Sequence, residues 1–73
     1  MKEVIIVGAS GMGREIYSWL STDKRNQNEY IIKGFIDNNP NKLKGYDYSC
    51  NIINSIENYM PAKNEMLING ILD

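Results

Sequence analysis

The sequence predicts a small α/β domain with a parallel, Rossmann-like sheet, and three features lead to this prediction. An unbroken apolar run occupies residues 4–7, a glycine-rich turn occupies residues 8–13, and an amphipathic segment continues to residue 20. An unbroken run of valine and isoleucine is typical of a strand that is buried on both faces. A strand, a tight glycine turn and a helix are the parts of a nucleotide-binding βα unit. We expect the order β-α-β-β-α-β, in three layers.

Length and composition restrict the class of protein. A chain of 73 residues allows one domain, residues 1–73, with a thin core. Its net charge of -1 gives no general attraction to nucleic acid or anionic lipid. Cys50 is the single cysteine and there is no histidine, which excludes an internal disulfide, a zinc site or a Ser-His-Asp triad. The sequence shows no secretory signal and no apolar run long enough to span a membrane, so we expect a cytoplasmic location and no membrane partner. From the charge and the residue types above we also expect no nucleic-acid partner and no metal.

The helix after the turn is expected to begin within the glycine motif and to end near Asp23. Its apolar residues share one face, which should lie on the sheet: Met12, Ile16, Trp19 and Leu20. Arg14, Glu15 and Ser18 are then expected to face water.

The remaining elements follow in order along the chain. Residues 29–37 are predicted to form the second strand, nearer an edge than the first and with a bulge at Gly34. Residues 48–53 are a candidate third strand. Asn54 and Glu57 have the spacing of a capping box, which predicts a helix over residues 54–60 that ends before Pro61. Residues 63–69 are predicted to form the last strand. Because an open α/β unit normally continues into a helix there, we expect a truncated unit from a larger protein.

The glycine motif is a variant of the dinucleotide fingerprint G-x-G-x-x-G. Gly8 and Gly13 occupy its first and third glycine positions, but Ser10 occupies the second. We expect Gly11 to allow the close approach of a pyrophosphate instead, and the Ser10 hydroxyl to donate to a phosphate. Asp37 follows Gly13 by 24 residues, at the end of the second strand, where a carboxylate accepts from ribose hydroxyls. In the alternative interpretation the glycines only form a tight turn and Asp37 only caps the asparagine-rich loop.

Four further residues are candidates for chemistry. Arg14 is a cation in the first helical turn, where it opposes the helix dipole, and is a candidate for an anion contact. Lys42 and Lys44 follow Asp37 in a polar loop, either within reach of a phosphate or simply solvated. Cys50 is expected to be a small hydrophobe.

Three stretches resemble the N-terminal domain of the sialic acid O-acetyltransferase NeuD family, the PglD-like bacterial sugar O- and N-acyltransferases. They are GASGMGREI at residues 8–16, GFIDN at residues 34–38 and NSIENY at residues 54–59. The family's turn reads GAGGHG or GASGHG and its second strand ends GFIDD or GFLDD. This chain therefore departs from the pattern at Met12 and Asn38.

The resemblance implies that the domain holds a nucleotide-sugar, usually UDP-linked, for an enzyme of cell-surface polysaccharide biosynthesis. Carried over by position, the residues around the phosphates are Gly8, Ser10, Gly11, Met12 and Gly13, and those at the nucleoside are Asp37 and Asn38. The resemblance also implies that no residue of this chain is catalytic and that this domain binds no cofactor. Acetyl-CoA, the catalytic histidine and the contacts of a homotrimer are expected in a C-terminal left-handed β-helix of hexapeptide repeats, which is absent from this chain.

Two other functions stay open on the sequence. The same turn is compatible with an NAD(P)-binding oxidoreductase fragment, although Ser10 argues against it. The chain is also compatible with a non-catalytic α/β module that regulates or docks a partner.

Overall fold

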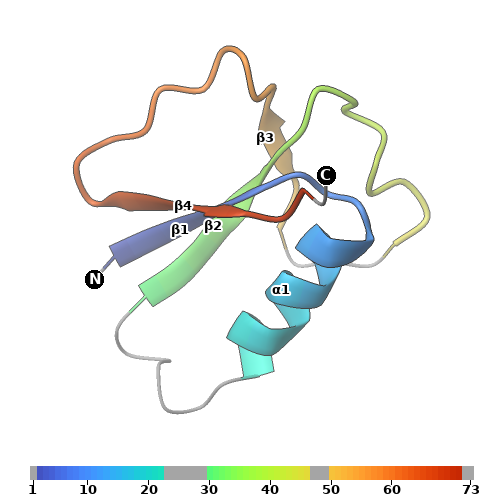
Figure 1. Cartoon of the computed structure of the whole chain (residues 1–73), viewed down its shortest axis with the longest axis horizontal. Helices are drawn as coiled ribbons and strands as arrows, with labels where there is room; N and C mark the ends of the chain where they lie inside the picture. Colours follow the sequence, from blue (N-terminus) through green and yellow to red (C-terminus); the bar gives the residue numbers. More distant parts are fainter. Residues whose placement is uncertain (1, 23–29, 47–49, 72–73) are drawn as a thin grey trace.

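The computed structural model describes residues 2–22, 30–46 and 50–71. In these ranges four strands form one sheet and a single helix lies against it (Figure 1). The elements are β1 (Lys2–Val7), α1 (Gly11–Thr22), β2 (Tyr30–Ile36), β3 (Ile52–Asn54) and β4 (Glu65–Asn69). The strand order is β3-β2-β1-β4 and every pair is parallel. This is the order of the first four strands of the Rossmann fold, and it confirms the predicted fold class.

Two of the predicted strands agree closely with the structure and the third agrees only in part. β2 and β4 lie inside the predicted ranges, and β3 begins later than predicted, at Ile52. α1 ends at Thr22. Three predicted positions lie outside the described residues: the helix end at Asp23, the start of the second strand at Glu29 and residues 48–49 of the third strand. Within the described ranges, no helix has the length and apolar character that crossing a membrane requires.

β1 lies between β2 and β4 and supplies the middle of the core. Val4, Ile5 and Ile6 are all buried. Because consecutive strand residues point to opposite faces of a sheet, burial of three in a row means that both faces of β1 are covered. The prediction from the apolar run is confirmed.

β2 contains the predicted bulge. Val4 pairs with Ile32, but the next residue, Ile5, pairs with Gly34, so Lys33 is the extra residue in the ladder. A Cβ at Gly34 would lie 2.8 Å from the backbone oxygen of Asn51, so the close approach of the chain before β3 requires glycine here. β3 pairs only with Phe35 and Ile36, which leaves the first half of β2 at an edge of the described sheet.

α1 packs on the sheet through a face that includes Ile16 and Leu20, as predicted, but it is rotated away from Trp19 and towards Tyr17. Ile16, Tyr17 and Leu20 contact the buried cluster around Phe35, and the Tyr17 and Phe35 ring centroids are 5.7 Å apart. Trp19 is 58% exposed, so its predicted place in the core is wrong. The reason is the rotation of the helix: Gly13 is the buried residue of the first turn, and the positions three, four and seven residues after it continue its stripe.

The second helix, predicted over residues 54–60, is not formed. Asn54 is the last residue of β3 and pairs with Ile36, so the strand continues through the proposed helix cap. The Asn54 and Ser55 side chains accept from the amides of Ser55 and Asn58, at 2.8 Å and 3.3 Å, and close a turn instead. Only a few residues then remain before Pro61, too few for a stable helix. The described part therefore has two layers rather than three.

Glu65 holds the loop between β3 and β4 in place of that helix. Its side chain is 3% exposed and accepts from Tyr59 Oη at 2.7 Å and from the Ala62 amide at 2.8 Å. Its other oxygen forms an ion pair with Lys33, the bulge residue. The hydrogen bond from Lys33 and those from Ala62 and Tyr59 lower the pKa of Glu65 from 4.5 to about 2.

Candidate functional site

The candidate site is a cavity of about 450 Å³ at the edge of the sheet where the parallel strands end. β1 connects through α1 to β2 on one side, whereas β4 pairs with β1 on the other side. The cavity therefore lies at the point where the strand order reverses, which is the usual ligand site of open α/β sheets. Its wall consists of Gly8, Ser10, Gly11, Met12, Asp37, Asn38, Lys42, Ile56, Gly70 and Ile71.

Two glycines allow the helix to start directly above the sheet. A Cβ at Gly13 would lie 1.9 Å from the carbonyl oxygen of Gly8, and a Cβ at Gly70 would lie 2.6 Å from Gly13 Cα. Gly8 itself has a φ of +92°, in the region that favours glycine. Gly13, predicted to be at the phosphates, is thus a packing residue behind the cavity, not one of its wall residues.

Gly11 differs from these glycines because it faces open space. A Cβ built on it meets no atom within 4 Å, and the residue lines the cavity. Packing within the described structure therefore does not require glycine at this position. A ligand that approaches the backbone closely would require it.

The start of α1 offers backbone donors to the cavity. The Ser10 carbonyl accepts the Arg14 amide at 2.9 Å, which makes Ser10 the N-cap residue. The amides of Gly11 and Met12, which line the cavity, belong to the first turn, where an α-helix supplies no carbonyl acceptor. Together with the positive end of the helix dipole, these amides favour an anion.

Asp37 joins the glycine turn to the loop after β2. Its Oδ2 accepts the Ala9 amide at 2.9 Å and its Oδ1 accepts the Asn39 amide at 2.8 Å. Asp37 therefore does cap the asparagine-rich loop, and it lies on the cavity wall as well. Because each carboxylate oxygen has two acceptor positions, Asp37 can still accept from a ligand.

Lys42 brings a cation to the start of the helix. Its Nζ donates to Ser10 Oγ at 3.0 Å, and the half-buried residue lines the cavity. The sequence did not distinguish Lys42 from Lys44, and no spacing motif does so. Lys44 is exposed and is not a wall residue of the cavity.

Arg14 braces the loop that carries Lys42. Its guanidinium donates to the Ala9 carbonyl at 3.0 Å and lies 4.4 Å from the centroid of the Tyr46 ring. It is half-buried rather than on the water-facing side predicted for it, and it is not a wall residue of the cavity. These contacts give Arg14 a structural role in positioning the loop.

Asn38 connects the end of β2 to the turn after β3. Its Oδ1 accepts the Ile56 amide at 2.9 Å, which places the Ile56 side chain at one end of the cavity. Gly70 and Ile71 form the other end, after β4. Sequence reasoning did not identify Ile56, Gly70 or Ile71, since nothing in their local pattern indicates which residues the topology places opposite the glycine turn.

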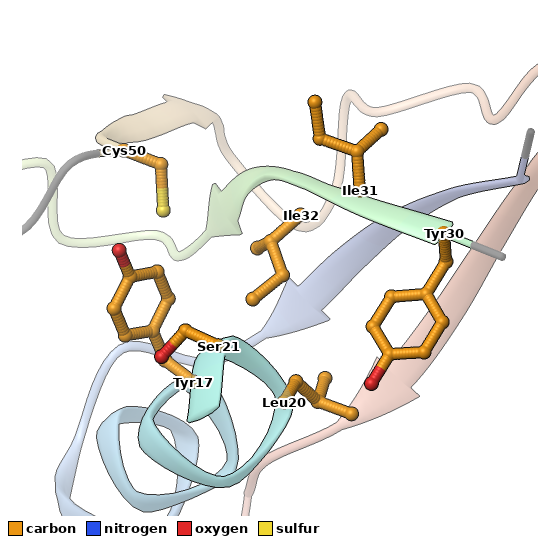
Figure 2. A pocket seen from close by; sticks show the side chains of 7 residues that line it. All are labelled: Tyr17, Leu20, Ser21, Tyr30, Ile31, Ile32 and Cys50. Atoms are coloured by element: carbon orange, nitrogen blue, oxygen red, sulfur yellow. The ribbon is translucent and has the colours of Figure 1, made fainter. Parts of the chain in front are cut away.

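A second cavity, of about 370 Å³, lies between the last turns of α1 and the first half of β2. Figure 2 shows Tyr17, Leu20 and Ser21 of the helix facing Tyr30 and Ile32, with Cys50 above them and Ile31 on the other side of the strand. Burial raises the pKa of the Cys50 thiol, so the uncharged, poorly nucleophilic form dominates. Among the described residues that line this cavity there is no cation and no helix start, whereas the first cavity has both on its wall. The first cavity is therefore the better candidate for a charged ligand.

Comparison with known proteins adds one match. The family model described as the PglD N-terminal domain matches residues 3–71. No curated protein and no solved structure matches this chain.

Proposed function

Because this chain belongs to the PglD N-terminal domain family, a domain of sugar acetyltransferases, we propose that it binds the nucleotide-sugar substrate of such an enzyme. The proposed ligand is a UDP-sugar or a similar nucleotide-sugar, and the proposed site is the cavity at the carboxyl edge of the sheet.

One observation carries this proposal: the glycine start of α1, Lys42 and Asp37 face the same cavity. The first-turn amides and the Lys42 ammonium complement a diphosphate, and the open position of Gly11 allows its oxygens to approach the backbone. The Asp37 carboxylate repels phosphate but accepts from hydroxyl groups, so it suits the ribose beside the diphosphate.

The proposed ligand also has a proposed direction in the cavity. The nucleoside lies towards β2 and β3, beside Asp37 and Asn38, because these residues supply the groups that recognise it. The sugar lies towards Gly70 and Ile71, at the β4 end of the cavity.

In this proposal the chain binds and orients the sugar but does not catalyse acetyl transfer. The amine or hydroxyl of the sugar would attack the thioester carbon of acetyl-CoA and release the CoA thiol, while a base takes the proton from the attacking group. The 73 residues contain no histidine to act as that base. We therefore propose that the base and the acetyl-CoA site belong to a hexapeptide-repeat domain that forms a trimer in the cytoplasm.

Isothermal titration calorimetry with UDP-N-acetylglucosamine, UDP, NADH and NADPH tests the proposal. Calorimetry is preferable to tryptophan fluorescence because Trp19, the single tryptophan, is exposed and is not a wall residue. We expect both UDP compounds to bind and the dinucleotides to bind at least about tenfold more weakly. A Cys50→Ala variant, altered in the second cavity, should bind UDP like the unaltered chain. Tighter binding of NADH, or no binding of either UDP compound at millimolar concentration, would refute the proposal.

A further inference from the structure

The loop after β2 is attached to the glycine turn at both of its ends, and both attachments lead to the buried residue Ala9. At the first end Asp37 Oδ2 accepts the Ala9 amide at 2.9 Å. At the second end Arg14 donates to the Ala9 carbonyl at 3.0 Å, and its guanidinium carbon lies 4.4 Å from the centroid of the Tyr46 ring. Lys42 lies between the two attachments, so its position depends on both.

Tyr46 is connected to Lys42 by a short run of turns. The Tyr46 amide donates to the Leu43 carbonyl at 3.0 Å, and Gly45, with a φ of +89°, lets the chain turn between them. Leu43 directly follows Lys42 and packs against the buried cluster. A single anchored side chain leaves the loop free to rotate about it, whereas the second attachment at Tyr46 removes that freedom. The ring of Tyr46 therefore helps to set the direction of the Lys42 side chain.

The position of Arg14 is unfavourable for the helix alone. Arg14 lies in the first turn of α1, where the positive end of the helix dipole opposes a cation. Its contacts with the Ala9 carbonyl and with the face of the Tyr46 ring offset this cost, since a ring face attracts a cation within about 6 Å. What these contacts achieve is the attachment of the loop to the helix.

We propose that Tyr46 is a positioning residue for phosphate binding: through Arg14 it holds Lys42 against Ser10, at the start of α1. This inference rests on the proposed function and adds a residue outside the cavity wall on which the affinity depends. Tyr46 carries no charge and does not line the cavity, so it acts through the position of Lys42, whose Nζ donates to Ser10 Oγ at 3.0 Å. Without the ring contact the loop adopts other positions as well, and the apparent affinity falls with the fraction of chains that are ready to bind.

Tyr46→Leu is the variant that tests this role. It removes the ring face but keeps an apolar side chain at a position that is 52% exposed. Tyr46→Phe keeps the ring and should restore the binding of UDP. The matched control is Trp19→Leu, which removes an aromatic ring that is 58% exposed and is not on the cavity wall. Arg14 is a less suitable probe, because its own charge contributes to the field at the start of the helix.

Calorimetry at low and at high salt measures the Kd of UDP for the unaltered chain, Tyr46→Leu, Lys42→Met and the double variant. Tyr46→Leu should weaken UDP binding about two- to fivefold, the strength of an exposed cation–π contact, and should reduce its dependence on salt. In the Lys42→Met background, Tyr46→Leu should have no further effect, because the cation that Tyr46 positions is already absent. Tyr46→Phe and Trp19→Leu should bind UDP like the unaltered chain.

Each contrary outcome has a distinct meaning. An equal loss of affinity with and without Lys42, as partial unfolding would produce, overturns the role of Tyr46, and so does an unchanged Kd or an unchanged salt dependence in Tyr46→Leu. A loss larger than that of Lys42→Met also overturns it, since a residue that acts through Lys42 contributes no more than Lys42 itself. In all these cases UDP binding by the unaltered chain still supports the proposed function. If the unaltered chain does not bind UDP, both proposals fail.

Discussion

Gly11→Ala separates ligand binding from folding more cleanly than any other change in the glycine motif. The Cβ that it adds meets no protein atom within 4 Å, so the fold accommodates it. Alanine also lowers the conformational entropy of the unfolded chain and favours the helix, which makes the variant neutral or up to about 1 kcal/mol more stable. For a domain of this size that corresponds to a melting temperature between unchanged and about 8 °C higher.

The same Cβ occupies space at the start of α1, where the diphosphate is proposed to approach the backbone. We expect UDP to bind at least about tenfold more weakly, a loss of about 1.4 kcal/mol or more, because the phosphate oxygens can no longer reach the first-turn amides at hydrogen-bonding distance. Calorimetry with UDP and thermal unfolding, followed by circular dichroism on the same samples, measure both effects.

Two further variants complete the experiment. Ser18→Ala, on the exposed face of α1, controls for helix propensity and should leave UDP binding unchanged. Gly13→Ala should instead destabilise the fold by about 1–3 kcal/mol or more, because its Cβ would lie 1.9 Å from the Gly8 carbonyl oxygen. The reasoning is refuted if Gly11→Ala binds UDP as tightly as the unaltered chain.

Three other predictions test the remaining contacts. In calorimetric titrations, Lys42→Met should weaken UDP binding about tenfold and reduce the dependence of this binding on salt. The control Lys44→Met should do neither. Equal effects of the two variants would contradict the role of Lys42. Asp37→Ala should lower the free energy of unfolding, measured in urea, by about 1–3 kcal/mol, because the Ala9 amide loses its acceptor. The variant should also lower the affinity for UDP. Unaltered stability would contradict the hydrogen bond between Asp37 and Ala9. Because the folded-state pKa of Glu65 is lowered from 4.5 to about 2, its stabilising contribution is complete above pH 4.5 and is lost as the pH falls towards 2. Glu65→Gln should therefore flatten this part of the curve of unfolding free energy against pH. An unchanged curve would disprove the contribution of Glu65.

The capping box at Asn54 and the predicted face of α1 show where local patterns fail. The capping-box spacing of Asn54 and Glu57 has the correct residue types, but Asn54 pairs with Ile36 in the sheet. Strand pairing is a contact between residues far apart in the chain, and it overrides a local preference that only a few residues before Pro61 support. The helix pattern was also misread at Trp19, because the close contact of Gly13 with Gly8, and not apolar periodicity alone, sets which side of α1 faces the sheet.

The sequence by itself determined the parts of the molecule whose causes are local. The unbroken apolar run at residues 4–7 predicted a strand buried on both faces, and Val4, Ile5 and Ile6 are buried as expected. Lys33 and Gly34 marked the bulge in β2. The glycine turn indicated a helix start suited to an anion, and the family pattern indicated a sugar acetyltransferase-related domain.

The tertiary structure alone decided which side chains meet at the cavity. Lys42 reaches Ser10, Asp37 reaches Ala9 and Asn38 reaches Ile56 across separations of 32, 28 and 18 residues. None of these contacts has a periodicity or spacing that marks it in the chain. They exist because parallel strands end at one edge of the sheet, so the loops that follow different strands are brought together there.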